Sequence, residues 1–177
     1  MACRLADEVL KDIVALFLVV SDELFADNGA VSPFSRFTQS ASDVLLVCKR
    51  WMRIGTPVLF TTVVVRSMPQ ARALALAMTN NPEFGRYTRK LRIEGAYGGY
   101  ILTAVRQMPN IRDLCMTVGI NSNISINGTL DALEMINPER VILTLAPPRT
   151  HKCLNRHILL ETLAEQICTW PRLVSRP

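Results

Sequence analysis

Few residues of this chain have types and spacings that could perform catalytic chemistry. His151, Cys153 and His157 lie close together in sequence, and only Cys168 remains as a fourth ligand for a metal ion. A structural zinc site uses four ligands arranged in two tight pairs, which this spacing does not provide. These residues are therefore assigned to a surface loop and the start of a helix. The chain has two histidines and no Gly-x-Ser-x-Gly segment, so it offers almost no residues from which a catalytic triad could be formed.

Two further segments have features of chemical sites. The glycine-rich segment Gly95–Tyr100 follows an expected strand and opens an expected helix, which is where phosphate groups bind. It matches neither the dinucleotide-binding pattern nor the P-loop, so it is interpreted as a turn that needs a positive φ angle. Asp7 and Glu8 form a carboxylate pair, but both fall in a first helical turn, where they favour the helix dipole. The sequence thus predicts a protein that is not an enzyme and binds no cofactor or metal.

Composition indicates a folded chain with a real core. Of the 177 residues, 49% are hydrophobic and 20% are charged, which argues against disorder over most of the length. The net charge of +5 comes mainly from arginine, with sixteen Arg against four Lys. These arginines are scattered and not interleaved with aromatic residues, so nucleic-acid binding is not expected.

The cysteines and the longest apolar run indicate a protein of the cell interior. Five cysteines is an odd number, and they are widely spaced within apolar runs, as is typical of reduced thiols. The apolar run Ile13–Val20 is too short to span a membrane and follows acidic residues instead of a basic leader. We interpret it as a helix buried on most sides. The predicted location is intracellular, in the cytoplasm or the nucleus or both, without membrane association.

The first part of the chain, residues 1–60, contains two helical segments separated by an insert at about 27–42. The first segment places apolar residues at positions 5, 9, 13, 16, 17 and 20, and the second ends near Trp51 before Pro57. The insert is rich in turn-forming pairs and is predicted to be a loop. Its Phe34 and Phe37 either fold back on the protein itself, which is favoured, or bind a partner. Two short helices that present apolar residues make a docking platform.

The second part, residues 61–177, alternates strand and helix. The expected strands are 61–65, 90–93, 113–116, 141–143 and 173–174. The expected helices cover 71–78, 101–108, 130–136 and 158–167. Strand plus helix recurring every 23 to 33 residues is typical of a solenoid built like leucine-rich repeats. The alternative is an ordinary α/β sandwich of parallel strands. Because the last expected strand has no covering helix and no polar cap, we expect the array to be incomplete.

Two segments carry a resemblance to a known family. Leu5-Ala6-Asp7-Glu8-Val9-Leu10 followed by Val47-Cys48-Lys49-Arg50-Trp51 resembles the F-box, the adaptor module of SCF-type ubiquitin ligases. Ala6 stands where the family prefers proline. The longer block from Val47 through Lys90-Leu91-Arg92-Ile93-Glu94-Gly95 is similar to a large group of F-box proteins of mushroom-forming fungi, in which a leucine-rich-repeat-like region follows the box. The similarity covers nearly all of the chain.

The resemblance implies a fold and a function. The fold class is α+β, with a small helical F-box-like module followed by an irregular strand–helix solenoid fragment. The function is that of a substrate-recognition adaptor whose F-box docks on the Skp linker subunit, and through it on cullin, while the repeats bind an unknown substrate protein. The implied contacts with the linker subunit are Leu5, Val9, Leu10, Ile13, Val47, Cys48 and Trp51. The alternative is a non-ligase interaction scaffold with a degenerate F-box.

Overall fold

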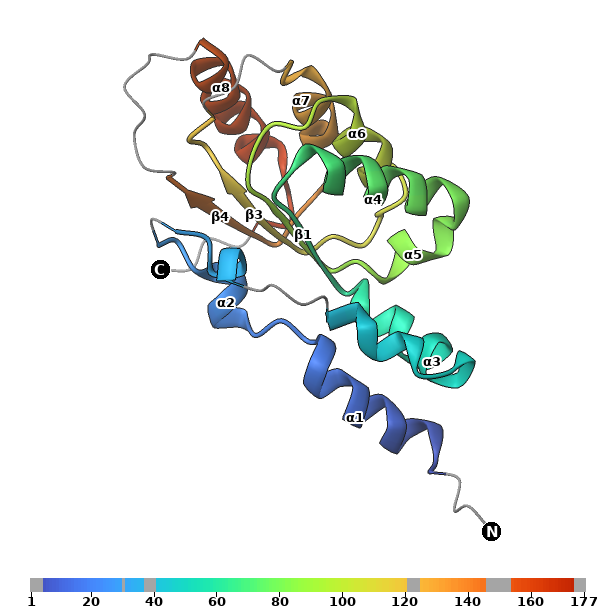
Figure 1. Ribbon diagram of the computed structural model, residues 1–177. Coiled ribbons are helices and arrows are strands. Elements are labelled where there is room, and N and C mark those ends of the chain that lie inside the picture. Colours follow the sequence, from blue (N-terminus) through green and yellow to red (C-terminus); the bar gives the residue numbers. More distant parts are fainter. Residues whose placement is uncertain (1–4, 30, 37–40, 121–124, 146–153, 174–177) are drawn as a thin grey trace.

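The chain folds into one parallel sheet with helices, and a separate helical cluster lies at one end of that sheet (Figure 1). The computed structural model describes residues 5–29, 31–36, 41–120, 125–145 and 154–173. The predicted mixture of helices and strands is confirmed. The sheet has the order β1-β2-β3-β4 and all its pairs are parallel. Its strands are β1 (Thr62–Val65), β2 (Lys90–Ile93), β3 (Asp113–Thr117) and β4 (Arg140–Thr144).

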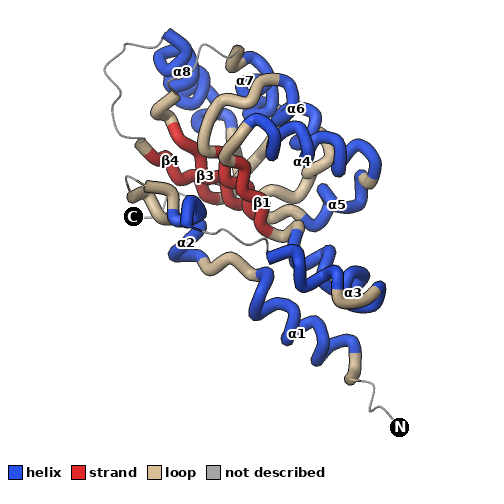
Figure 2. Tube along the Cα trace, viewed as in Figure 1, coloured by secondary structure: helices blue, strands red, loops and turns tan. Residues whose placement is uncertain are grey.

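The helices that follow the strands cover one face of this sheet (Figure 2). They are α4 (Met68–Asn80), α5 (Pro82–Tyr87), α6 (Gly99–Val105), α7 (Asn127–Glu134) and α8 (Leu154–Thr169). α4 packs against α6, α6 against α7, and α7 against α8. Strands and covering helices therefore both stand side by side in sequence order.

The main core lies between the sheet and these helices. Alternate strand residues point toward the helices, because successive side chains of a strand face opposite ways. The strand contribution consists of Val63, Val65, Leu91, Ile93, Leu114 and Met116. Ile101, Leu133 and Leu159 meet them from the helical layer and are almost fully buried. Each such side chain stabilises the fold by about 1.5–3 kcal/mol relative to an exposed one.

The glycine-rich turn has the conformation that the sequence predicts. Gly98 has φ of 57°, in the region that favours glycine, and α6 begins at the next residue. Gly128 of α7 lies against this turn so closely that a Cβ atom there would stand 2.5 Å from the carbonyl carbon of Gly98. The turn thus allows α6 and α7 to approach each other at backbone distance.

The N-terminal cluster has a small core of its own. It is formed by α1 (Asp7–Leu18), the 3-10 helix η2 (Ala41–Leu46) and α3 (Lys49–Leu59). Its buried residues are Leu10, Val14, Leu18, Leu45 and Val58. α3 connects directly to β1 and packs beside α5, so the cluster lies at the β1 end of the sheet.

The apolar run of α1 is less buried than its composition suggests. Leu16 is 83% exposed, and Phe17 and Val19 are exposed as well. The expectation of a helix buried on most sides is therefore wrong. Only every fourth residue of α1 faces η2 and α3, because the cluster covers a single side of the helix.

Between α1 and η2 in the chain, α2 (Asp22–Ala26) and the 3-10 helix η1 (Pro33–Arg36) lie on the second face of the sheet, opposite α4–α8 (Figure 1). α2 precedes the loop predicted at about 27–42, whereas η1 falls inside it, so that loop is partly helical. The ring of Phe34 stands 5.5 Å from the guanidinium carbon of Arg92 in β2. The prediction that the insert folds back on the protein is confirmed for Phe34, whereas Phe37 lies outside the described residues.

The end of the chain differs from the prediction. Trp170 follows α8, Pro171 and Arg172 form a turn, and Leu173 is not in a strand but packs against the main core. The expected strand at 173–174 is therefore wrong at Leu173, while Val174 lies outside the described residues. Packing of the Leu173 side chain against the main core outweighs its local strand propensity. Within the part of the chain that the structure describes, no helix is long and apolar enough to cross a membrane.

Candidate partner-binding surfaces

The two segments that resemble the F-box meet at the starts of α1 and α3. Asp7, the first residue of α1, accepts hydrogen bonds from Arg50 Nε at 2.8 Å and Nη2 at 2.6 Å, and from Arg53 Nη2 at 2.7 Å. Arg50 also donates to the backbone carbonyl oxygen of Leu5. Hydrogen bonds from Arg50 and then from Arg53 hold the pKa of Asp7 below its usual range. Side chains more than forty residues apart thereby fix the relative position of the two helix starts.

These charged groups line a pocket at the surface. Its volume is about 570 Å³, and its lining residues are Asp7, Lys49, Arg50 and Arg53. The lining thus contains three positively charged side chains and one carboxylate. The entrance to the α1–α3 junction is therefore positively charged.

An apolar surface adjoins this junction. Val9 and Leu16 are exposed and lie seven residues apart, which places them on one side of α1, and Leu5 is exposed two residues before the helix begins. Leu46 is 79% exposed and Val47 is 64% exposed, and both directly precede α3. We refer to these five residues as the N-terminal surface. α1 contacts both η2 and α3, and exposed aliphatic side chains on such neighbouring elements are typical of protein interaction sites.

The predicted contact residues divide into exposed and buried ones. Leu5, Val9, Val47 and Cys48 are exposed. Ile13 is half-buried, and Trp51 is half-buried with its side chain packed on the core of the N-terminal cluster.

Leu10 differs from the other predicted contacts, because it is only 2% exposed inside the cluster. In this structure Leu10 supports the surface from within and is not available to a partner. Sequence reasoning gave no contact role to Leu16 and Leu46, although the spacing from Val9 to Leu16 is a signal that places both on one side of the helix.

A second surface is the face of the sheet that α4–α8 do not cover, and we call it the polar face. Strand register aligns its residues in rows across the strands. One row consists of Thr62, Lys90, Asp113 and Arg140. The next row consists of Val64, Arg92, Cys115 and Ile142. Charged and apolar residues alternate in Lys90-Leu91-Arg92-Ile93-Glu94, which indicates a strand with one polar face, and sequence reasoning did not use this pattern.

α2 neutralises the charged row. Asp22 accepts hydrogen bonds from Lys90 Nζ at 2.8 Å and from Arg140 Nη1 at 2.8 Å and Nη2 at 2.6 Å. Arg140 also donates to Asp113 at 2.7 Å. Hydrogen bonds from Arg140 and then Lys90 hold the pKa of Asp22 well below its usual range, and the same carboxylates raise the pKa of Arg140. The Lys90 ammonium also lies 5.5 Å from the centre of the Phe25 ring.

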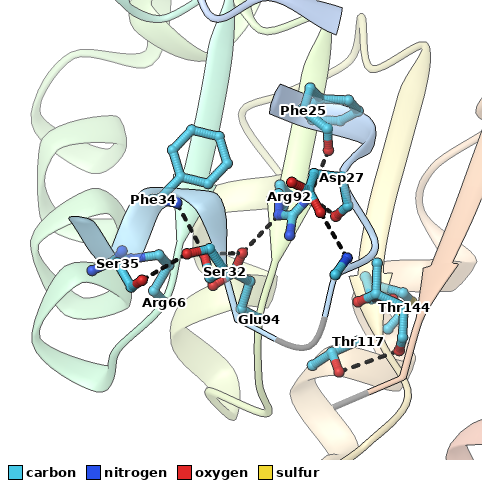
Figure 3. Close-up of polar contacts among 12 residues, drawn as sticks. Phe25, Asp27, Ser32, Phe34, Ser35, Arg66, Arg92, Glu94, Thr117 and Thr144 are labelled. Atoms are coloured by element: carbon cyan, nitrogen blue, oxygen red, sulfur yellow. Dashed lines mark hydrogen bonds and ion pairs between the residues drawn. The ribbon is translucent and has the colours of Figure 1, made fainter. Parts of the chain in front are cut away.

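Arg92 is the most buried cation of the polar face, with 3% of its surface exposed. Its Nε donates to Glu94 Oε1 at 2.7 Å, and its Nη1 donates to the carbonyl oxygens of Phe25 at 2.7 Å and Asp27 at 2.8 Å (Figure 3). The hydroxyl of Ser32 donates to the same Glu94 oxygen at 2.8 Å. The guanidinium is therefore held largely by the segment that covers it.

The residues that were weighed as metal ligands and assigned to a loop and a helix start fall partly within the described residues. His151 and Cys153 lie outside them. His157 is exposed on α8, where its Nδ1 stands 3.2 Å from Glu161. Among the residues that the structure describes, no three His, Cys, Asp or Glu side chains are placed to hold a metal ion.

Comparisons of the chain with family models, with curated proteins and with solved structures gave no match.

Proposed function

We propose that this protein is a substrate-recognition adaptor of an SCF-type E3 ubiquitin ligase. The N-terminal cluster docks on the Skp linker subunit, and the strand–helix region, interpreted as a leucine-rich-repeat-like array, binds a substrate protein. The adaptor has no catalytic activity of its own. Its place of action is the cytoplasm or the nucleus.

One observation carries the proposal. The two segments that resemble the F-box lie against each other through Arg50 and Asp7, and they leave an unpartnered apolar surface beside that contact. Aliphatic and aromatic side chains contribute most of the energy of an interface once water is excluded from them. Strands and helices that stack in sequence order support the array, since successive repeats are neighbours in a solenoid.

Binding of purified Skp linker subunit from a mushroom-forming fungus tests the proposal by co-elution in size-exclusion chromatography. The variant Leu5→Asp/Val9→Asp places two charges on the N-terminal surface and is expected to abolish co-elution. Both residues are exposed, so the far-UV circular dichroism of the variant should equal that of the parent. Leu76→Asp is the matched control, because Leu76 is 61% exposed on α4.

Equal co-elution of the parent and the Leu5→Asp/Val9→Asp variant contradicts the proposed docking surface. Absence of binding by the folded parent at micromolar concentrations favours the second candidate, an interaction scaffold with a degenerate F-box. The observation behind that candidate is Ala6, which caps α1 without a side-chain hydrogen bond.

A further inference from the structure

The two faces of the sheet differ in composition. The face under α4–α8 is built from valine, leucine, isoleucine and methionine. The polar face carries Lys90, Arg92, Asp113 and Arg140, and the segment of α2 and η1 covers it only in part. The Arg92–Glu94 pair is buried, whereas the Lys90 and Arg140 side chains keep 24% and 36% of their surface exposed and pair with a half-exposed Asp22. Ion pairs that reach solvent contribute little to stability, and buried ones can often be replaced by apolar residues, so stability alone does not account for these charges. Charged side chains suit a surface that also meets water in another state.

α2 and the carbonyl groups at its end contact the polar face in three chemical ways. The carboxylate of Asp22 binds Lys90 and Arg140. The ring of Phe25, which is fully buried, lies three residues further on. Backbone carbonyl oxygens of the segment receive the hydrogen bonds of Arg92, and every peptide carries such carbonyls. Within α2, the side chains that contact the polar face are therefore an acidic residue and an aromatic residue three positions later, and further along the segment Ser32 and Phe34 add a hydrogen bond to Glu94 and a ring beside Arg92.

Charge complementarity indicates the same kind of occupant. Among the ion pairs of the described residues, Lys90, Arg92 and Arg140 would keep those with Asp113 and Glu94 if the segment left, and three cations would then stand beside two carboxylates. Asp22 supplies the missing negative charge from a side chain that is half exposed at the start of a five-residue helix. A second carboxylate can therefore reach Lys90 and Arg140 from solvent before the Phe25 ring leaves its site.

We propose that the polar face is a binding site for a partner peptide with an acidic residue three positions before an aromatic one, and that residues 21–29 and 31–36 occupy this site in the absence of that peptide. As the substrate site of a ligase adaptor, this inference rests on the proposed function. As a peptide-binding site it stands alone, because the assays below contain no linker subunit.

Amide hydrogen exchange of the full chain tests whether the cover opens. The amides of Leu24 and Phe25 both donate to Ser21 within α2, whereas the amides of β2 belong to the centre of the sheet. If the segment detaches without unfolding of the sheet, the α2 amides exchange roughly a hundredfold faster than those of β2. Equal exchange rates in the two elements would show a permanent part of the fold and overturn the proposal.

Peptide binding tests the chemistry of recognition. The probe is a fluorescent synthetic peptide of residues 20–29, titrated into the full-length variant Asp22→Ala/Phe25→Ala, whose own segment binds weakly. We expect saturable anisotropy with the variant and about tenfold weaker binding to the parent, since the parent's own segment competes for the site. The same peptide with Asp22→Lys should bind about tenfold more weakly, while Glu23→Lys, at an exposed neighbouring position, should change affinity less than threefold.

Each remaining outcome decides against the proposal. Loss of far-UV circular dichroism in the Asp22→Ala/Phe25→Ala variant would show that the segment belongs to the core. If the variant is folded but does not bind the peptide, the polar face is not a peptide-binding site. Dimerisation of the parent through exchange of residues 21–36 between copies would assign the face to a second chain. Failure of the linker subunit to bind has no bearing on these results.

Discussion

The N-terminal surface and the polar face depart from the usual distribution of residues in opposite directions. On the first, aliphatic side chains such as Leu16 and Leu46 are exposed although the cluster beneath them has its own core. On the second, a charged guanidinium, that of Arg92, is buried although the opposite face of the same sheet is apolar. A buried charge needs a partner of opposite charge or a hydrogen bond, and covering exposed apolar groups lowers the free energy of the system. The first surface is therefore left open among the described residues, whereas residues of the chain itself cover part of the second.

The largest expected effect comes from Arg92→Ala, which tests whether the polar face depends on that guanidinium. The substitution leaves the carboxylate of Glu94 without its cation and two carbonyl oxygens of the α2 segment without their donor. We expect a loss of about 3–5 kcal/mol in the free energy of unfolding. Urea denaturation measures it.

Arg106→Ala is the control for that experiment, because Arg106 is exposed at the end of α6. It should change the free energy of unfolding by less than about 0.5 kcal/mol. If both variants lose the same small amount, the buried arginine is not what holds the segment on the sheet.

Substitutions at two neighbouring residues of α1, one buried and one exposed, compare the core of the N-terminal cluster with its surface. Leu10→Ala removes a side chain from the core of the N-terminal cluster and should cost about 2–3 kcal/mol. Val9→Ala, one position earlier on an exposed part of the helix, should cost less than about 0.5 kcal/mol. Thermal unfolding of the two variants measures the difference. Similar melting temperatures would mean that α1 is not packed as described.

A smaller, pH-dependent effect is expected at Asp22. Its pKa in the folded protein is lowered by Arg140 and Lys90, so the carboxylate stabilises the fold fully above its ordinary pKa of 3.8 and loses that contribution as the pH falls below it. The variant Asp22→Asn should therefore show a flatter decrease of stability below pH 4 than the parent, as followed by urea denaturation at each pH. Asp12→Asn, at an exposed carboxylate of α1, should leave the slope of the parent unchanged.

The strands were predictable where local patterns decide them. The sequence predicts 90–93 and 113–116, and the structure has β2 at Lys90–Ile93 and β3 at Asp113–Thr117. Short apolar runs bounded by turns are sufficient for such elements. The same reasoning failed at Leu173, because burial against the main core, and not local propensity, determines its conformation.

The polar face could not be predicted, because its contacts are long-range. Asp22 and Arg140 are 118 residues apart in sequence, and Phe25 and Arg92 are 67 apart. No local pattern brings these residues together. Likewise, Leu10 and Val9 are both apolar, and only the positions of η2 and α3 determine which of them is buried.

Hydrogen exchange in the presence of the Skp linker subunit tests most directly whether the N-terminal surface and the polar face have different partners. We expect that the linker subunit slows amide exchange in peptides covering residues 5–18 and 44–53 and leaves the exchange rates of the strands and of α2 unchanged. Protection over the sheet, or no protection over α1 and the start of α3 when the linker subunit is saturating, would contradict it.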